Sequence, residues 1–281
     1  MNDSLWILTV AIIASIACAL TGSTLVIRRQ ALTADAISHA VLPGIFFAYS
    51  ISGGRNSFWL LPGAAAAGWF AAFLIQGLQS KLKLPSESAT GLVFTAMFAL
   101  GVVLISYYAR QVDLDAECLL YGEMAYIPLE QFYLGDTPIG PKALWVLTPV
   151  VLFCIITLLP FYRYWNLISF DSIQARLLGY SPVWGHQWLM ALVSWVCVAA
   201  FQAVGAILVV ALMVIPAQTA LLYARNLKQV WIQATLWALV SAIGGWWLAE
   251  LLAAAYAASI GLVSLVAFGA VFLFTMPRRN T

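Results

Sequence analysis

Long apolar segments alternate with short polar connections along almost the whole chain. Each segment holds about 20 residues, the number that a helix needs to cross the hydrocarbon core of a bilayer. A helix also satisfies its own backbone hydrogen bonds inside lipid. The pattern therefore predicts an all-α integral membrane protein, a polytopic bundle of about eight or nine transmembrane helices. The predicted segments are 5–27, 32–51, 58–78, 89–108, 143–162, 187–203, 205–224, 230–252 and 257–276.

The sixth and seventh segments are divided by very few residues. Val204 and Gly205 mark the division, and Pro216 interrupts the seventh segment. Proline and glycine are tolerated within a span where neighbouring helices satisfy the freed backbone groups. A broken or re-entrant helix is therefore an alternative to two separate spans in this part of the chain.

Basic residues are concentrated on one side of the predicted bundle. With the N-terminus outside, all but three of the 13 lysines and arginines fall in inside connections or at the C-terminus. The three exceptions are Arg55, Arg110 and Lys142. Cytoplasmic loops typically carry such an excess. The charges therefore favour nine spans, with the N-terminus outside and the C-terminus inside.

Composition agrees with this pattern and limits the domain count. Of the 281 residues, 63% are hydrophobic and only 9% are charged, whereas soluble domains have about 25% charged residues. We therefore expect one transmembrane domain over 1–281. No GxxxxGK[ST] motif occurs, so we expect no ATPase domain in the chain. The net charge of +2 says little about partners, and we expect the lipid bilayer, and no nucleic acid, to contact the chain.

A carboxylate and an imidazole lie four residues apart near the start of the second segment. Asp35 and His39 share one face of a helix, so both side chains can hold one cation. An ionisable residue inside a span is costly and is by default a candidate functional site, and these donors suit a borderline divalent metal. The alternatives are a hydrogen-bonded core imidazole for His39 and an N-terminal helix cap for Asp35.

This pair cannot complete the coordination of a metal ion by itself. Two donors are too few for a closed tetrahedral or octahedral shell. Water, or the same pair from a second subunit, would supply the other ligands. Asp35 also lies only ~4–5 Å along the helix axis from Leu32, at a rise of about 1.5 Å per residue. Hydropathy therefore places the pair near the inside end of its segment.

The inside connection between the fifth and sixth segments contains a predicted short helix, at about 169–181. Ser169 or Asp171 can cap its N-terminus, Gly179 suits the position after its C-terminus, and Pro182 prevents continuation. Ile173 and Leu177 give it one small apolar face. Such a short helix persists only when something packs against it. The partner is either the lipid interface or a groove on a cytoplasmic protein.

Two further features carry candidate functions. Glu250, near the outer end of the eighth segment, is a candidate for a cation pathway, with interfacial packing as the alternative. The outside connection 109–142 is rich in acidic residues. It is either a solvated loop or a face that attracts cations or a metal-carrying protein.

Two other functional classes remain open at this stage. Histidine and aspartate also form proton relays, so a proton-coupled secondary metal transporter is the main alternative to an ATP-driven one. A membrane hydrolase is the second alternative, although no second carboxylate or glycine-flanked nucleophile accompanies Asp35 and His39.

Several stretches of the chain resemble one known family. The string RRQALTADAISHAVLPG, at 28–44, is similar to a signature near the N-terminus of permease subunits of bacterial manganese/zinc/iron ABC importers. The stretches 87–106, 111–123 and 204–220 resemble further parts of the same permeases. The resemblance covers nearly the whole chain and implies the fold of a type II ABC importer-like permease in the bacterial cytoplasmic (inner) membrane.

The resemblance also implies partners and roles. It implies a second permease subunit in a homodimer or paralogous heterodimer, two cytoplasmic ATP-binding subunits and an extracytoplasmic metal-binding protein. The chain itself would be a transporter subunit, not an enzyme, with no permanently bound cofactor. Its cargo would be Mn²⁺, Zn²⁺ or Fe²⁺, bound by Asp35 and His39. The implied ATPase-coupling residues are Asp171, Ile173, Ala175, Leu177 and Gly179.

Overall fold

The computed structural model describes residues 3–52, 60–108, 124–134 and 137–275. Nearly all of the described chain is helical, and one small antiparallel hairpin is formed by β1 and β2. The elements are α1 (Asp3–Ile27), α2 (Ala31–Ala40), α3 (Leu42–Ser52), α4 (Leu60–Lys81), α5 (Ser86–Tyr108), η1 (Met124–Tyr126), β1 (Gln131–Leu134), β2 (Thr137–Pro141), α7 (Lys142–Leu158), α8 (Tyr162–Phe170), α9 (Ser172–Leu177), α10 (Pro182–Val204), α11 (Ala206–Leu221), α12 (Leu227–Leu252) and α13 (Tyr256–Thr275).

The long helices form one membrane-type bundle. Within the described residues, 7 helices are long and apolar enough to cross a bilayer, when α2 and α3 are taken together. The bent pair α7–α8 gives an eighth, and α11 is a shorter apolar helix of 16 residues. The expected all-α polytopic fold is therefore confirmed, and each predicted apolar segment corresponds to one of these helices or helix pairs.

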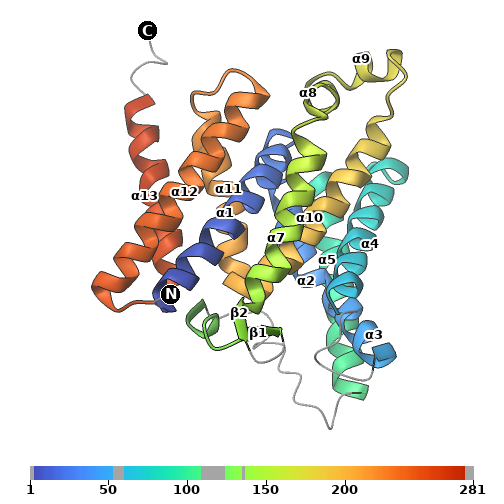
Figure 1. Cartoon of the computed structure of the whole chain (residues 1–281). Coiled ribbons are helices and arrows are strands. Elements are labelled where there is room, and N and C mark those ends of the chain that lie inside the picture. Colours follow the sequence, from blue (N-terminus) through green and yellow to red (C-terminus); the bar gives the residue numbers. More distant parts are fainter. Residues whose placement is uncertain (1–2, 53–59, 109–123, 135–136, 276–281) are drawn as a thin grey trace.

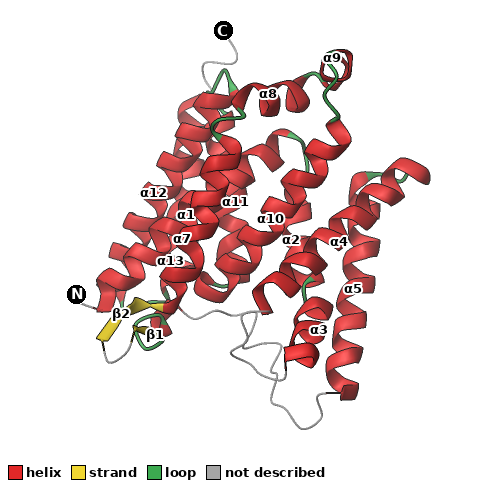
Figure 2. Ribbon diagram, turned by 45° about the vertical axis from the view of Figure 1, so that its right-hand side comes forward, coloured by secondary structure: helices red, strands yellow, loops and turns green. Residues whose placement is uncertain are grey.

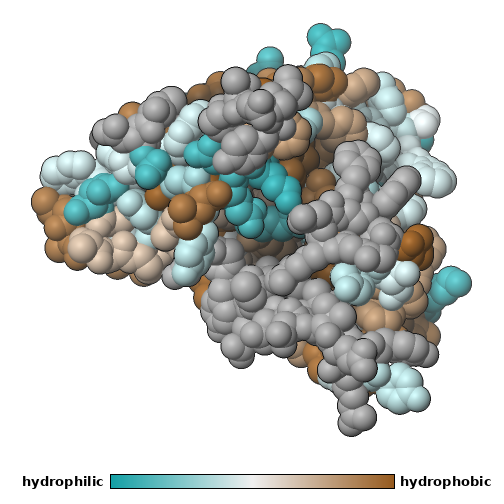
Figure 3. Space-filling view, turned by 60° about the horizontal axis from the view of Figure 1, so that its bottom comes forward, coloured by the Kyte–Doolittle hydropathy of each residue, from teal (hydrophilic) through white to brown (hydrophobic). Residues whose placement is uncertain are grey.

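The two ends of the bundle differ in the elements that they carry. The start of α1 and the β1–β2 hairpin lie at one end, and α8, α9 and the last turn of α13 lie at the other (Figures 1 and 2). From the loop charges we expect the α8–α9 end to face inside. Figure 3 shows the opposite end, where hydrophilic residues gather beside apolar flanks. Of the predicted outside features, Arg55, Arg110 and the part 109–123 of the acidic connection 109–142 lie outside the described residues.

The second predicted segment is divided into two helices. α2 ends at Ala40 and α3 begins at Leu42, after a turn at Val41. Pro43 has no backbone N–H, so it cannot donate the hydrogen bond that a continuous helix would send to the carbonyl of His39. The interruption therefore falls directly after the candidate metal-binding residues.

The fifth predicted segment also ends earlier than hydropathy indicates. α7 stops at Leu158, and the chain turns by 73° into α8. Pro160 cannot continue a straight helix at this position. Trp165, whose side chain is only 1% exposed, donates its indole N–H to the carbonyl of Thr157 at 3.0 Å. This hydrogen bond holds α8 across the end of the bundle. The predicted boundary at 162 was wrong because the chain turns at Pro160.

The core surrounds α1, which packs against α7, α10, α11 and α12. The approach of α1 to α11 is very close, because a Cβ added at Gly22 would lie 2.2 Å from the backbone oxygen of Met213. Cys18, Cys154 and Cys197 are buried free thiols in this core. The tight packing around α1 leaves α2, α3, α4 and α5 as a second group along one flank of the bundle (Figure 2).

Candidate metal centre

Asp35 and His39 are brought together on one face of α2. The Nε2 atom of His39 lies 3.8 Å from Oδ1 of Asp35. The opposite face of α2 is buried, with Ala34 and Ile37 fully inside the core. The Asp35 side chain is 54% exposed and that of His39 is 30% exposed. The pair is therefore held by a packed helix but remains accessible from one side of the chain.

Aromatic rings of α5 enclose the imidazole. The His39 ring meets Phe94 at a centroid distance of 5.4 Å and Phe98 at 6.0 Å, both edge-to-face. Its Nδ1 atom is enclosed and has no hydrogen-bond partner in the described structure. Nε2 is thus the nitrogen that faces Asp35, and the two side chains offer one nitrogen and one carboxylate to the same point in space.

The alternative roles for these two residues can now be compared with the geometry. Asp35 is the fifth residue of α2, whose N-cap position is Gln30, so the interpretation of Asp35 as a helix cap was wrong. Within the described residues, Nδ1 of His39 has no hydrogen-bond partner, and Nε2 lies 3.8 Å from the Asp35 carboxylate. The arrangement is compatible with a pair of cation ligands.

Asp35 and His39 offer two candidate ligands, and the described residues add no third one nearby. They contain no group of three or more histidine, cysteine, aspartate or glutamate side chains that could hold a metal ion. Zinc prefers four ligands and manganese prefers six. Because Asp35 is on an exposed face, the additional ligands of a bound ion would come from water or from another subunit.

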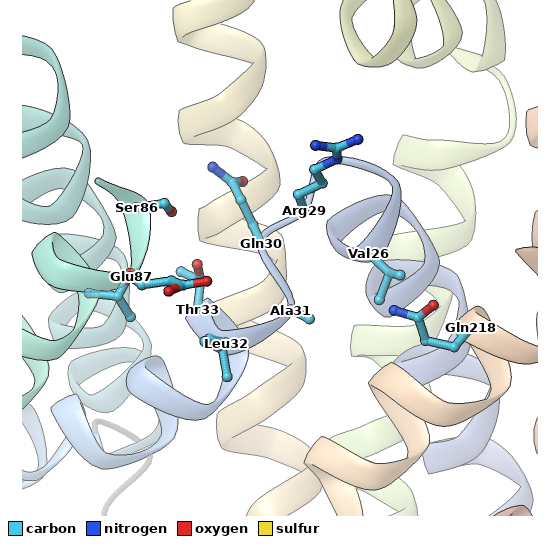
Figure 4. Close-up of a pocket in the computed structure, with 10 residues that line it drawn as sticks. Val26, Arg29, Gln30, Ala31, Leu32, Thr33, Ser86, Glu87 and Gln218 are labelled. Carbon is cyan, nitrogen blue, oxygen red and sulfur yellow. The ribbon is translucent and has the colours of Figure 1, made fainter. Parts of the chain in front are cut away.

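The pair lies deeper in the bundle than its segment boundary predicted. In both ribbon views α2 lies near half the height of the bundle (Figures 1 and 2). α10 continues beyond the connection between α1 and α2 (Figure 4). The inside end of the bundle is built by α7, α8 and α10, which extend past the start of α2. Hydropathy of one segment contains no information on how far its neighbours extend.

A partly buried arginine lies between the start of this region and α8. Arg28 directly follows α1, and its Nη1 atom is enclosed without a hydrogen-bond partner in the described structure. Burial lowers the pKa of the Arg28 guanidinium from its usual value, whereas the interaction with Tyr164 of α8 raises it. Arg28 of the α1–α2 connection therefore lies near Tyr164 of the helix that precedes α9.

The predicted short inside helix is present as α9, over Ser172–Leu177. Oδ1 of Asp171 accepts the backbone N–H groups of Ile173 at 3.2 Å and Gln174 at 2.8 Å. Asp171 is thus its N-cap, and Ser169 belongs to the preceding helix α8. The α-helix itself is shorter than the predicted range, because a turn follows Leu177.

The end and the surface of α9 also follow the sequence pattern. Gly179 has φ +82°, a conformation that favours glycine, and its N–H donates to the carbonyl of Arg176 at 3.0 Å. Ala175 is buried, whereas Ile173 is 73% exposed and Leu177 is 83% exposed. An apolar face is therefore presented at the outermost end of the bundle (Figure 1).

Glu250 belongs to a different part of the molecule. It lies near the end of α12, where it accepts a hydrogen bond from the Tyr256 hydroxyl at 2.7 Å. Tyr256 begins α13, so this bond closes the α12–α13 turn. The turn lies at the end of the bundle that carries the N-terminus (Figure 1).

A half-open pocket of about 280 Å³, lined by both polar and apolar side chains, lies at the α1–α2 connection and was not predicted from the sequence. Glu87 and Thr90 of α5 line one side, and Gln218 of α11 lines the other (Figure 4). Gln30 and Thr33 lie between them. Glu87, just before the fourth apolar segment, could have drawn attention as a charged residue at the start of a membrane helix. Its position beside α2 and α11 depends on how the helices pack, which the sequence pattern does not specify.

Comparisons with known proteins agree with this architecture. The chain matches the ABC 3 transport family over residues 3–275. It is 36% identical, over 98% of its length and 93% of the relative, to the manganese transport system membrane protein MntD of Bacillus subtilis. It is 38% identical, over 96% of its length and 73% of the relative, to the zinc transport system membrane protein TroD of Treponema pallidum.

A solved structure also matches most of the chain. PsaBC from Streptococcus pneumoniae, in complex with Fab, gives a TM-score of 0.78 at 27% identity. The match covers 97% of this chain and 91% of that chain.

The apolar helices and the comparisons together define a multi-pass α-helical permease of the bacterial inner membrane. The chain belongs to the ABC 3 transport family, whose named relatives here are membrane subunits of manganese and zinc transport systems.

Proposed function

We propose that the chain is the permease subunit of an ATP-driven importer and that it carries a divalent metal ion across the membrane. The ion, Mn²⁺, Zn²⁺ or Fe²⁺, is held by Asp35 and His39. The observation that carries this proposal is the approach of Nε2 and Oδ1 to 3.8 Å on one face of a membrane helix. The names of the manganese and zinc relatives support the class of cargo.

An incomplete protein shell suits transport. A transported ion must bind well enough to enter the membrane and loosely enough to leave it. In this proposal Asp35 and His39 provide two ligands, and water or the matching pair of a second permease subunit provides the others. A two-fold axis close to the exposed side of α2 would bring the two pairs together. The second subunit is either another copy of this chain or a related permease.

The energy source in this proposal is a pair of separate ATP-binding subunits. α9 is their docking element: its apolar face, formed by Ile173 and Leu177, is exposed at the inside end. Asp171 and Gly179 fix the two ends of this helix, and the buried Ala175 fixes its inner face. An extracytoplasmic metal-binding protein delivers the ion to the opposite end. Glu250 accepts a hydrogen bond from Tyr256 at the α12–α13 turn, and its role in a cation pathway stays a prediction.

The energy source separates this proposal from a proton-coupled secondary transporter. We expect uptake of radioactive manganese or zinc by cells that express the complete transporter to stop when ATP is depleted, even with the proton gradient intact. Uptake should persist when a protonophore collapses the gradient while ATP is maintained. The opposite pair of results would favour the secondary transporter. Supplying the metals in competition identifies the preferred ion.

A further inference from the structure

The cavity at the α1–α2 connection is continuous with the metal-binding face of α2. Leu32 lines the cavity. Asp35 and His39 follow at i+3 and i+7, so all three residues lie on one side of the helix. The exposure of Leu32 and Asp35 agrees with this common face. One turn of helix therefore separates the wall of the cavity from the carboxylate of the pair.

On α5, the residues that line the cavity and those that contact His39 also lie on one side of the helix. Glu87 and Thr90 line the cavity, and Phe94 and Phe98 contact the ring of His39. These four positions recur at three- and four-residue intervals, which places them on one stripe of α5. The seam between α2 and α5 thus has the His39 pocket at one level and the cavity at a level nearer the inside.

The cavity offers oxygen donors and room for water. Figure 4 shows the Glu87 side chain extending from the start of α5 towards Thr33 at the start of α2. The Oε1 atom of Gln30 is enclosed and has no hydrogen-bond partner in the described structure. A volume of about 280 Å³ holds several waters at about 30 Å³ each. Hard divalent ions favour carboxylate, carbonyl and water oxygens of this kind.

Positive potential opposes tight retention of a cation in this cavity. The N-termini of α2 and α5 both border it, and each helix N-terminus carries about +0.5 elementary charge. Arg29 also lines it. Within the described residues, no salt bridge joins Glu87 to a basic side chain, so its charge is not neutralised there. One carboxylate in such surroundings attracts a hydrated cation without holding it firmly.

We propose that this cavity is the release chamber of the transporter and that Glu87 is its cation-attracting residue. The inference rests on the proposed metal transport through Asp35 and His39. An ion that leaves the pair passes along the α2–α5 seam, regains water beside Glu87 and is then expelled to the inside. Arg29 and the two helix N-termini speed this last step by disfavouring retention.

The test uses the complete permease–ATPase complex in proteoliposomes with radioactive manganese. For Glu87→Gln we expect maximal turnover to fall about tenfold, because the barrier to release rises. The half-saturating metal concentration and the metal bound through Asp35 and His39 should stay unchanged. Glu87→Asp should restore most of the rate. Asp3→Asn, which removes an exposed carboxylate at the opposite end, should match the wild type.

Arg29→Gln provides a second test with the opposite sign. It should strengthen inhibition by manganese placed on the cytoplasmic side, whereas Glu87→Gln should weaken it. A helix-stabilising role for Glu87 would leave this inhibition unchanged. Normal turnover and normal inhibition in Glu87→Gln would overturn the release chamber alone. Failure of the wild type to bind manganese through Asp35 and His39 would instead overturn the proposed function.

Discussion

Metal uptake is expected to fall to background when either residue of the α2 pair is replaced by its neutral or non-basic analogue. Asp35→Asn removes the charge, and His39→Gln removes the ring nitrogen that lies 3.8 Å from the carboxylate. In the proposed site Asp35 and His39 are the two protein ligands of the ion, so each substitution removes half of the protein's ligands. We expect a reduction of at least about 100-fold, since even groups that merely orient metal ligands contribute about 10–100-fold.

A matched control separates this loss from misfolding. Ser38→Ala removes a polar group from the same helix, but its buried hydroxyl donates to the backbone carbonyl of Asp35 and is not one of the two proposed ligands. Ser38→Ala should retain most uptake. All three variants should reach the membrane in equal amounts and copurify with the ATP-binding subunits. Normal uptake by a correctly assembled Asp35→Asn or His39→Gln variant would refute the ligand assignment.

Loss of coupling is the second large effect that we expect. Leu177→Glu places a charge on the most exposed apolar position of α9. A desolvated groove on the ATP-binding subunit would reject this carboxylate, because burying an unpaired charge is costly. We therefore expect the ATP-binding subunits to dissociate, or ATP hydrolysis to become independent of the permease. Both outcomes are measured by copurification and by metal-stimulated ATPase activity.

Gln174→Glu is the control for this experiment. It adds the same charge to the same helix, on an exposed position beside the Ile173–Leu177 face. Its effect should be small, and metal binding should be normal in both variants. If Leu177→Glu kept a fully coupled complex, α9 would be better described as a helix that rests on the lipid interface.

The segment pattern predicted the bundle well because hydropathy reports directly on burial in lipid. The details of α9 were also accessible, since Asp171 and Gly179 act through local backbone geometry. The breaks after Ala40 and Leu158 were not predicted. Both lie close to proline, but whether a proline bends, breaks or merely interrupts a membrane helix depends on neighbouring helices.

The candidate site was only partly accessible from sequence. The spacing of Asp35 and His39 was sufficient to place them on one face, because both belong to one helix. Their depth depends on how far α7 and α10 extend, and the enclosure of His39 depends on Phe94 and Phe98 of another helix. The cavity beside Glu87 required the packing of α2, α5 and α11, which no local pattern specifies.

Pulsed electron paramagnetic resonance of Mn²⁺ bound to the purified permease–ATPase complex tests the central claim most directly. The chain has only 2 histidines, His39 and the buried His186 of α10. We predict a nitrogen coupling from an imidazole ligand that persists in His186→Gln and disappears in His39→Gln. A wild-type spectrum without nitrogen coupling, or a coupling that survives in His39→Gln, would contradict the assignment of Asp35 and His39 as the ligands of the transported ion.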